Sequence, residues 1–558
     1  MSKTSIQLCQ YAIFCHRWLG VAFCALFLVW FVSGIVMMYW GYPGVDAAER
    51  LARSATLDAS RIRISPEEAY SSLELAQPPD RVRIVMLDGR PVYRFHYDAL
   101  QFVVYADDGQ PVEAIRAESA LRIASAWTGQ PESAARFEGF NTEEDQWTVS
   151  QTFRPLRPLW KYSWPNGEQV YVSQVTGEVV QHTTRGSRIG AYFGAIPHWL
   201  YFTPLRKNQS LWSKIVIWSS GIGTVFAMLG LVVGIWVYSP SKRYRLEGGP
   251  TGIPYTGQKR WHAILGLIFG LVTCTWVFSG MLSMNPFPER ASDGNDTGVS
   301  RIAAALRGGP VAMAAFAAKH PREAVAEAGS DLQVKQLELT SFAGEPVYLA
   351  RETPQHSRII SVLGPVSGPD SGLVPGPGPG KAAAEFDRDR ILDVVTEASQ
   401  PGGLAEVRWV TEYEAYYLDR HNQLPLPVLF VRLKDSENTL LYIDPRTARV
   451  INSYGSRSRW TRWLYHGLHS IDLPWLYKHR PAWDIVVLVL MLGGTSLCVT
   501  AVIIGFQLLR RKLGLRLVRS IPSAGIAELK SGESIPSHGE NLSHGENASH
   551  GEERLRNR

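Results

Sequence analysis

Cysteine is scarce in this sequence, with only five residues in a chain of 558. All of them lie in the N-terminal lead-in or in apolar stretches, at Cys9, Cys15, Cys24, Cys274 and Cys498. The polar segments therefore hold no disulfide, and no CxxC or Cys/His zinc spacing is present. GxSxG, HExxH, P-loop and dinucleotide-binding motifs are also missing. The sequence thus gives no support for a hydrolase, a zinc protease, an NTPase or a nicotinamide or flavin domain.

Charged residues are also few, at 19% against about 25% in average soluble proteins. They are absent from four long apolar stretches, at 18–45, 215–241, 261–288 and 485–509. Each stretch exceeds the roughly 20 residues that cross a bilayer as a helix. The first is much longer than the apolar core of a signal peptide, which has about 7–15 residues. The sequence therefore predicts an α-helical membrane protein with four spans.

Basic residues beside the spans predict the orientation. The loop between the second and third spans and the segment after the fourth carry Lys242, Arg243, Arg245, Lys259, Arg260, Arg510, Arg511, Lys512, Arg516 and Arg519. Loops rich in Lys and Arg stay in the cytoplasm, so we place this loop and both termini there. The two long polar segments then lie outside. The net charge of +6 is largely a topology signal, and it calls for no nucleic-acid partner.

The expected organisation alternates spans with outer domains. Its parts are 1–41 (N-terminus and first span), 42–211 (first outer domain), 212–239 (second span), 240–260 (basic loop), 261–288 (third span), 289–482 (second outer domain, with a Gly/Pro linker at 364–380), 483–509 (fourth span) and 510–558 (basic, low-complexity tail). The outer segments read as α+β modules. Ser65-Pro66 is a helix start, and alternating strands are expected over 81–97 and 101–112. Further helix-then-strand units are expected over 117–183, 334–362 and 386–454.

The two halves of the chain resemble each other. His16-Arg-Trp-Leu-Gly20 opens the first span and His262-Ala-Ile-Leu-Gly266 opens the third. The same offset aligns three further pairs, Trp30 with Trp276, Ser33 with Ser279 and Gly34 with Gly280. We therefore predict a four-helix transmembrane bundle made from two parallel repeats, related by an axis along the membrane normal.

Histidines at the span ends are the candidate site residues. His16 and His262 begin spans on the cytoplasmic side, whereas His198, His466 and His469 precede spans on the outer side. A two-fold axis brings equivalent residues to the same depth, so we expect His16 to face His262 and His198 to face His466. Paired imidazoles on facing helices are what a six-coordinate haem iron requires. His469 is either an alternative ligand or a supporting partner.

Other histidines carry weaker signals. His421 lies among aromatic and charged residues and is either a substrate contact or the cap of a loop. The tail from about 520 repeats Ser-His-Gly-Glu, and its histidines at His538, His544 and His550 belong to low-complexity sequence. No catalytic residue is assigned from the sequence.

These motifs resemble the PepSY-associated transmembrane family. The spans carry the likeness in His16-Arg-Trp-Leu-Gly20 with Phe-Val-Ser-Gly, and in His262-Ala-Ile-Leu-Gly266 with Phe-Ser-Gly. The outer modules are similar to PepSY domains at Tyr171-Val-Ser-Gln-Val-Thr-Gly and Tyr442-Ile-Asp-Pro-Arg-Thr-Ala, where Ala448 replaces the usual Gly. Members include inner-membrane ferric-siderophore reductases with two b-type haems. The resemblance implies periplasmic PepSY-like domains and haem ligation by His16, His198, His262, and His466 or His469.

Three functions compete at this point. The first is a bacterial inner-membrane electron-transfer protein that reduces a ferric siderophore or another ferric chelate, with quinol or a cytoplasmic reductase as electron donor. The second is a PepSY-domain binding or regulatory protein that modulates a peptidase. The third is a transporter of iron chelates, although the spans lack the ionisable residues expected along a substrate path.

Overall fold

The computed structural model describes residues 3–98, 100–287, 298–363, 382–419 and 422–519. Within these ranges four helices are long and apolar enough to cross a membrane. They are α1 (Lys3–Met37), α8 (Gln209–Val237), α9 (Gly257–Leu282) and α15 (Ala482–Arg519). The four predicted spans are confirmed as helices of this kind. The boundaries differ at the first, because α1 begins well before residue 18 and His16 lies inside the helix instead of opening it.

The chain divides into two compact units, residues 1–506 and 507–558. The described part of the second unit, residues 507–519, is the end of α15. The predicted Gly/Pro linker at 364–380, His421 and the Ser-His-Gly-Glu tail lie outside the described residues.

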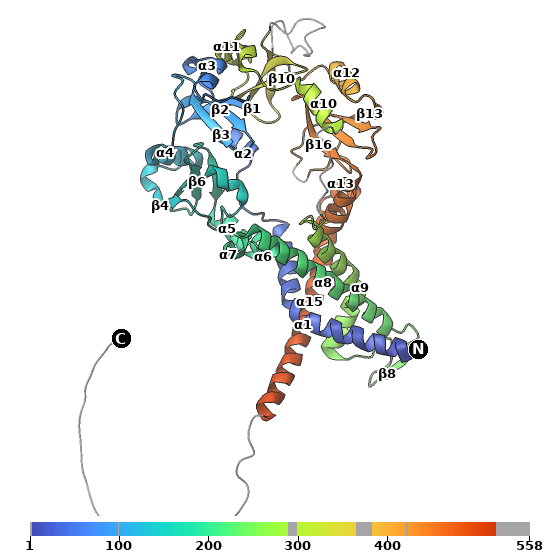
Figure 1. The fold of residues 1–558 in the computed structure, drawn as a ribbon. Helices are drawn as coiled ribbons and strands as arrows, with labels where there is room; N and C mark the ends of the chain where they lie inside the picture. The colour runs from blue at the N-terminus through green and yellow to red at the C-terminus, as the bar shows by residue number, and fades with distance from the viewer. Residues whose placement is uncertain (1–2, 99, 288–297, 364–381, 420–421, 520–558) are drawn as a thin grey trace, which may run out of the picture. The chain divides into compact units, whose positions relative to one another are not determined.

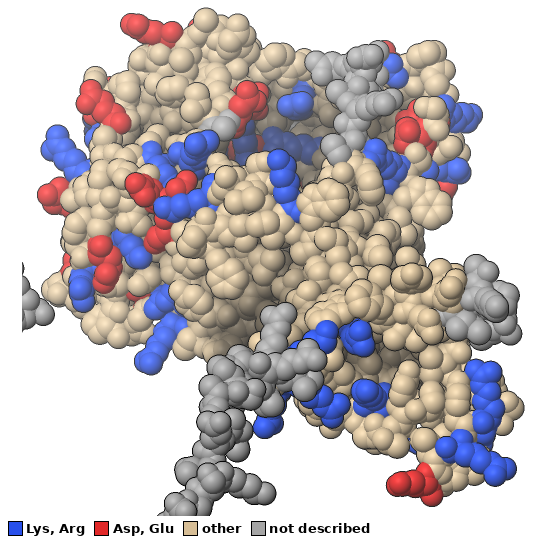
Figure 2. Space-filling model, turned by 60° about the horizontal axis from the view of Figure 1, so that its bottom comes forward, with Lys and Arg blue, Asp and Glu red and all other residues tan. Residues whose placement is uncertain are grey.

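The long helices carry large apolar side chains on their exposed surface, as a lipid-facing helix does. Trp218 is 69% exposed, and Ile268 and Phe506 are also exposed. The connection between α8 and α9 forms a small hairpin of β8 (Tyr244–Leu246) and β9 (Gly249–Thr251) that contains Arg245. Figure 2 shows Lys and Arg predominating in the lower part of the molecule, whereas basic and acidic side chains are mixed over the upper part.

The first outer segment begins with two helices and three strands, which are followed by a third helix and four more strands (Figure 1). These elements are α2 (Ala47–Arg53), α3 (Pro66–Ser71), β1 (Arg81–Leu87), β2 (Arg90–Tyr97), β3 (Leu100–Tyr105), α4 (Ala117–Thr128), β4 (Arg136–Asn141), β5 (Leu159–Ser163), β6 (Gln169–Ser173) and β7 (Val179–Thr183). The predicted start of α3 is present as a capping box between Ser65 and Glu68, with Pro66 in the first turn. Three short helices, α5 (Arg185–Phe193), α6 (Ala195–Trp199) and α7 (Thr203–Arg206), then lead into α8.

The second outer segment follows a similar plan. Its elements are α10 (Gly298–Arg307), α11 (Pro321–Glu327), β10 (Gln336–Phe342), β11 (Glu345–Arg351), β12 (Ser357–Ser361), α12 (Arg388–Ala398), β13 (Leu404–Val410), β14 (Val428–Leu433), β15 (Leu440–Asp444) and β16 (Arg449–Tyr454). The chain then returns to the last span through α13 (Ser456–Thr461), a π-helix (Arg462–Gly467) and α14 (Pro474–Tyr477).

The two outer segments share one sheet. A six-stranded sheet has the order β12-β11-β10-β1-β2-β3, so strands from both segments meet in antiparallel pairing of β1 with β10. Two four-stranded sheets, β4-β5-β6-β7 and β13-β14-β15-β16, belong to one segment each. The expected α+β character is present, but the segments do not form two independent modules, because they share a hydrophobic core that includes Ile84 and Leu337.

Local geometry recurs at a spacing of 271 residues in the second half of each outer segment. Gly177 has φ 67° and Ala448, its counterpart, has φ 50°. The turn therefore keeps its left-handed backbone even though alanine stands where a glycine is the least strained residue. Leu200 and Ile471 likewise both have positive φ, at 53° and 51°.

Candidate functional site

The first histidine pair lies between α1 and α9. The ring centres of His16 and His262 are 6.2 Å apart, as the sequence prediction of facing residues requires. His16 Nδ1 lies 3.3 Å from the Phe226 carbonyl oxygen in α8. His262 Nδ1 lies 3.1 Å from Thr500 Oγ1 in α15. All four spanning helices thus contribute to the surroundings of this pair.

The second pair joins the two segments that lead into α8 and α15. His198, in α6, and His469, directly after the π-helix, have ring centres 6.1 Å apart. His198 Nδ1 is 3.0 Å from the Trp30 carbonyl and 3.1 Å from Ser33 Oγ, both in α1. His469 Nδ1 makes the equivalent contacts in α9. It lies 3.3 Å from the Trp276 carbonyl and 3.1 Å from Ser279 Oγ.

Hydrogen bonding fixes which ring nitrogen carries the proton. The Ser33 and Ser279 hydroxyls donate to the carbonyls of Trp30 and Trp276, and the Thr500 hydroxyl donates to a backbone carbonyl. These hydroxyl oxygens are therefore acceptors toward histidine, and so are the backbone carbonyls. Nδ1–H must be the donor in all four rings, which leaves the Nε2 lone pair for a metal. Burial lowers the pKa of His198 to about 4, so this ring is neutral at physiological pH.

The separation of the rings suits a metal between them. A metal bonded to two imidazole nitrogens at about 2 Å on opposite sides places the ring centres about 6 Å apart. The two pairs are separated by 6.2 and 6.1 Å. No group of three or more His, Cys, Asp and Glu side chains comes together among the residues that the structure describes. Two protein ligands per site fit a metal whose remaining ligands come from a macrocycle, as in six-coordinate haem.

Glycines lie against three of the four rings, and at Gly230 and Gly34 a side chain would crowd the ring. A Cβ atom at Gly230 would lie 2.5 Å from His16 Cε1. At Gly34 it would lie 3.3 Å from His198 Cε1, and at Gly280 it would lie 3.6 Å from His469 Cε1. Gly34 and Gly280 belong to the repeated Trp-x-x-Ser-Gly motif, so the same motif supplies both the hydrogen bonds and the space.

A cavity of about 640 Å³ surrounds the outer pair, a volume typical of cofactor and small-molecule sites. Trp30 and Trp276 line it, and the indole Nε1 of each is buried with no hydrogen-bond partner among the described residues. Buried donors of this kind normally have a partner, so the lining is suited to a ligand with acceptor groups. His466 also lines the cavity, but its ring packs on Tyr465, 4.7 Å away.

The structure thus pairs His198 with His469. The sequence had favoured His466 as the partner of His198 and gave His469 as the alternative. The spacing to the tryptophan that begins the following span region could have identified His469, because Trp212 follows His198 by the same number of residues as Trp483 follows His469. The two tryptophans also make equivalent bonds, since each indole N–H donates to the carbonyl of the residue after its histidine, at 2.9 and 3.1 Å.

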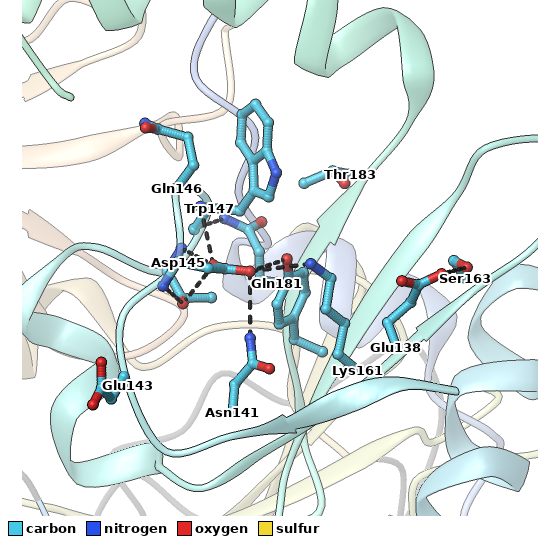
Figure 3. Close-up of polar contacts among 12 residues, drawn as sticks. Glu138, Asn141, Glu143, Asp145, Gln146, Trp147, Lys161, Ser163, Gln181 and Thr183 are labelled. Carbon is cyan, nitrogen blue, oxygen red and sulfur yellow. Dashed lines mark hydrogen bonds and ion pairs between the residues drawn. The ribbon is translucent and has the colours of Figure 1, made fainter. Parts of the chain in front are cut away.

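A loop of the first outer segment that contains Asp145 and Gln146 contacts the chain directly after α6 (Figure 3 shows the loop). The Gln146 side chain donates to the Tyr201 carbonyl at 2.8 Å and accepts from the Thr203 hydroxyl, also at 2.8 Å. Asp145 holds this loop by accepting from Tyr171 OH at 2.6 Å. Burial opposes ionisation of Asp145, but the hydrogen bonds and the Lys161 charge lower its pKa below the usual value. The loop therefore fixes the turn between α6 and α7, next to His198.

The protein is, by its fold, a multi-pass membrane protein with α+β domains. A family model described as the PepSY-associated TM region matches residues 14–356. The chain belongs to this family. No curated protein matches the sequence.

Proposed function

We propose that this protein is a bacterial inner-membrane di-haem b-type electron-transfer protein. It reduces a ferric siderophore or another ferric chelate in the periplasm and so releases iron. The two histidine pairs carry this proposal, because each presents two imidazoles with Nδ1–H engaged and with ring centres about 6 Å apart. The family to which the chain belongs supports the proposal, because its members include ferric-siderophore reductases.

The two pairs are too far apart to serve one cofactor. From His16 to Trp30, whose carbonyl contacts His198, α1 rises by about 20 Å. The same step separates His262 from Trp276 in α9. Since the hydrocarbon core is about 30 Å thick, two sites at these levels lie toward opposite faces of the bilayer. We therefore propose two haem sites in a chain built from two parallel repeats.

The residues have distinct tasks in this proposal. Haem b, when bound, supplies reversible one-electron transfer at iron. His16 with His262, and His198 with His469, would hold it through Nε2. The Nδ1–H bonds orient each ring and strengthen its nitrogen as a donor. Phe27, buried between the two levels, excludes water from the interior. With cytoplasmic termini, the inner site faces the electron donor, either quinol or a cytoplasmic reductase.

Single histidine variants test the pairing. Each of His16, His198, His262 and His469 is replaced by Ala, and haem content and reduced-minus-oxidised spectra are measured on purified protein. We expect His16→Ala and His262→Ala to remove one haem, and His198→Ala and His469→Ala to remove the other. His466→Ala is the matched control and is expected to retain both. Full haem content in all variants would refute the proposal, and colourless wild-type protein would favour peptidase regulation instead.

The substrate side is tested separately in proteoliposomes. We expect chemically reduced protein to be reoxidised by a ferric chelate that cannot cross the membrane, added on the side of the outer domains. Haem that stays reduced with every ferric chelate would leave haem binding intact and rule out chelate reduction.

A further inference from the structure

A group of arginines lies on one face of the sheet that the two outer segments share, where the two segments meet. In β1, Val82 and Ile84 enter the hydrophobic core, so Arg81 and Arg83 project from the opposite face. On the neighbouring strand β10, Glu338 pairs in register with Arg83. The face opposite the core is therefore charged where strands from the two segments meet.

One carboxylate at the centre of this face contacts three arginines. Glu338 is fully buried and accepts from Arg81 through both oxygens, at 2.8 and 2.9 Å. Arg449, at the start of β16, reaches the same carboxylate at 2.7 Å, and Arg351 in β11 lies 3.5 Å from it. Two of these arginines remain about one-third exposed, Arg81 at 36% and Arg449 at 33% of the side chain.

A second carboxylate next to it is shared in the same way. Glu178 is 3.1 Å from Arg83 and 3.8 Å from Arg94, and Arg94 is only 3% exposed. The Arg94 Nε atom has no hydrogen-bond partner within the described ranges. His96, whose Nε2 accepts from Arg83, has its pKa lowered to about 4 by burial and by that arginine, so it adds no charge at neutral pH.

The arginines of this group outnumber the glutamates. Five arginines contact these two carboxylates. Asp80, beside Arg81, and Asp444, whose charge acts on Arg351, are further acidic neighbours, and the arginines still outnumber all four carboxylates. An ion-pair network that only joined the two segments would be most stable with balanced charges, because unpaired charge is costly to remove from water. The excess therefore indicates a further anion that the group receives from solution.

A cavity opens directly beside these arginines. It has a volume of about 630 Å³ and is lined by Arg81, Arg449, Thr340, Arg307 and Asp80, among others. Arg307, from α10, is exposed, and its guanidinium makes a single hydrogen bond among the described residues, to the Ala303 carbonyl at 3.4 Å. Figure 2 shows a hollow in the upper part of the molecule with basic side chains on its floor. Guanidinium groups bind carboxylates through two parallel hydrogen bonds, so this lining suits a small polycarboxylate.

We propose that this cavity is a binding site for a small polyanion bearing carboxylates, and that a ferric polycarboxylate chelate is its ligand. The identity of the metal rests on the proposed function, whereas the charge of the ligand rests on the arginines alone. The site selects against cationic and neutral chelates, because neither supplies the missing negative charge. It acts as a capture site in the outer region, separate from the histidine pairs.

Binding of a redox-inert probe tests the proposal independently of electron transfer. Gallium(III) citrate is titrated calorimetrically into the purified full chain at low ionic strength, alongside the gallium complex of a cationic trihydroxamate. We expect the citrate complex to bind at least tenfold more tightly than the cationic complex, with an affinity that falls as salt is added. Equal binding of both complexes, or no binding of gallium citrate, would overturn the proposal.

Two variants locate the site. Arg307→Gln removes an exposed cation whose one hydrogen bond among the described residues is to its own helix, and we expect gallium citrate to bind several-fold more weakly. Arg449→Gln leaves Glu338 with two arginines, and we expect a loss of tenfold or more. Arg122→Gln, an exposed arginine paired with Asp88, is the control and should bind as the wild type does. Unchanged affinity in both Arg307→Gln and Arg449→Gln would refute the site, with a cooperative thermal unfolding transition confirming that each variant is folded.

The two proposals can fail separately. Gallium citrate binding without reoxidation of reduced protein by any ferric chelate would uphold this site and refute the reductase. Reoxidation without gallium citrate binding would uphold the reductase and refute the anion site.

Discussion

Two hydrogen-bond acceptors on α1 hold His198, and one of them is a side chain that can be removed without altering the backbone. In Ser33→Ala the ring keeps the Trp30 carbonyl but loses the hydroxyl at 3.1 Å. Loss of a group that orients a metal ligand weakens metal affinity by about 10–100-fold. We therefore expect the rate of haem transfer from Ser33→Ala to an apo-globin acceptor to rise at least tenfold for one haem only.

Ser219→Ala is the matched control for this experiment. Its hydroxyl also bonds a helix carbonyl, that of Val216 at 3.2 Å, but Ser219 does not line the cavity around the outer pair. Haem retention equal to the wild type in Ser33→Ala would show that the serine does not orient the ligand.

At the inner pair, a glycine is the residue most sensitive to substitution. A Cβ atom at Gly230 would meet His16 at 2.5 Å, closer than side-chain carbons approach one another, whereas at Gly221 in the same helix the nearest atom, Met281 Sδ, would be 3.5 Å away. We expect Gly230→Ala to displace the His16 ring and to lower haem content from two per chain toward one. Gly221→Ala should retain two, measured by pyridine haemochrome, and two haems in Gly230→Ala would contradict the placement of His16.

At the scale of elements, the sequence was sufficient to predict the four spans and one of the two histidine pairs. The spans follow from their length and lack of charge, and His16 and His262 follow from a motif repeated on two regular helices. His469 was not preferred over His466, because the segment before it contains a π-helix at Arg462–Gly467. A π-turn holds an extra residue and so rotates every later side chain, which α-helical spacing does not anticipate.

The shared sheet was not predictable for a different reason. Strand β1 pairs with β10 across more than 250 residues, and the alternation of each strand reveals its buried face but not its partner. The charged residues Arg81 and Glu338 looked like ordinary surface positions in the sequence. Only the pairing of the two strands shows that they form one buried network.

This network makes a prediction about acid stability. Burial opposes ionisation of Glu178, but the charges of Arg94 and Arg83 lower its pKa to about 2, and arginines likewise hold the pKa of Glu338 below its usual value. A carboxyl whose pKa is lower in the folded state stabilises the fold above the unfolded pKa of about 4.3, and this stability is lost as the pH falls toward the folded pKa. We expect the thermal unfolding midpoint of the outer domains to fall between pH 5 and pH 3.

Removing the central carboxylate tests the same network at neutral pH. Glu338→Gln leaves three arginines without a counter-charge, and breaking a buried ion pair costs about 3–5 kcal/mol. We therefore expect a lower thermal unfolding midpoint than in the wild type. Glu143→Gln, at a carboxyl that is 84% exposed, should unfold as the wild type does. A Glu338→Gln midpoint equal to the wild type would show that the network does not join the two outer segments.

At the scale of the whole molecule, orientation determines the direction of electron transfer in the proposed function. The outer segments both connect the end of one spanning helix to the start of the next, so they lie on the same side of the membrane. The hairpin of β8 and β9 connects α8 to α9 on the other side, and Lys242, Arg243 and Arg245 lie directly before it or in it. In the orientation that the positive-inside rule predicts, the histidine pair at His198 and His469 lies toward the periplasm.

Cysteine labelling in intact cells tests this orientation. Ser133 in the first outer segment and Gly248 in the hairpin are both exposed, and a Cβ atom at Gly248 would meet nothing within 4 Å. Each is replaced by Cys in a chain in which Cys9 and Cys15 are replaced by Ser. Because a membrane-impermeant maleimide reaches only the periplasmic side, we expect Ser133→Cys to be labelled in spheroplasts and Gly248→Cys only after lysis. The reverse pattern would place the outer domains in the cytoplasm, and a reductase with that orientation would deliver electrons away from any periplasmic chelate.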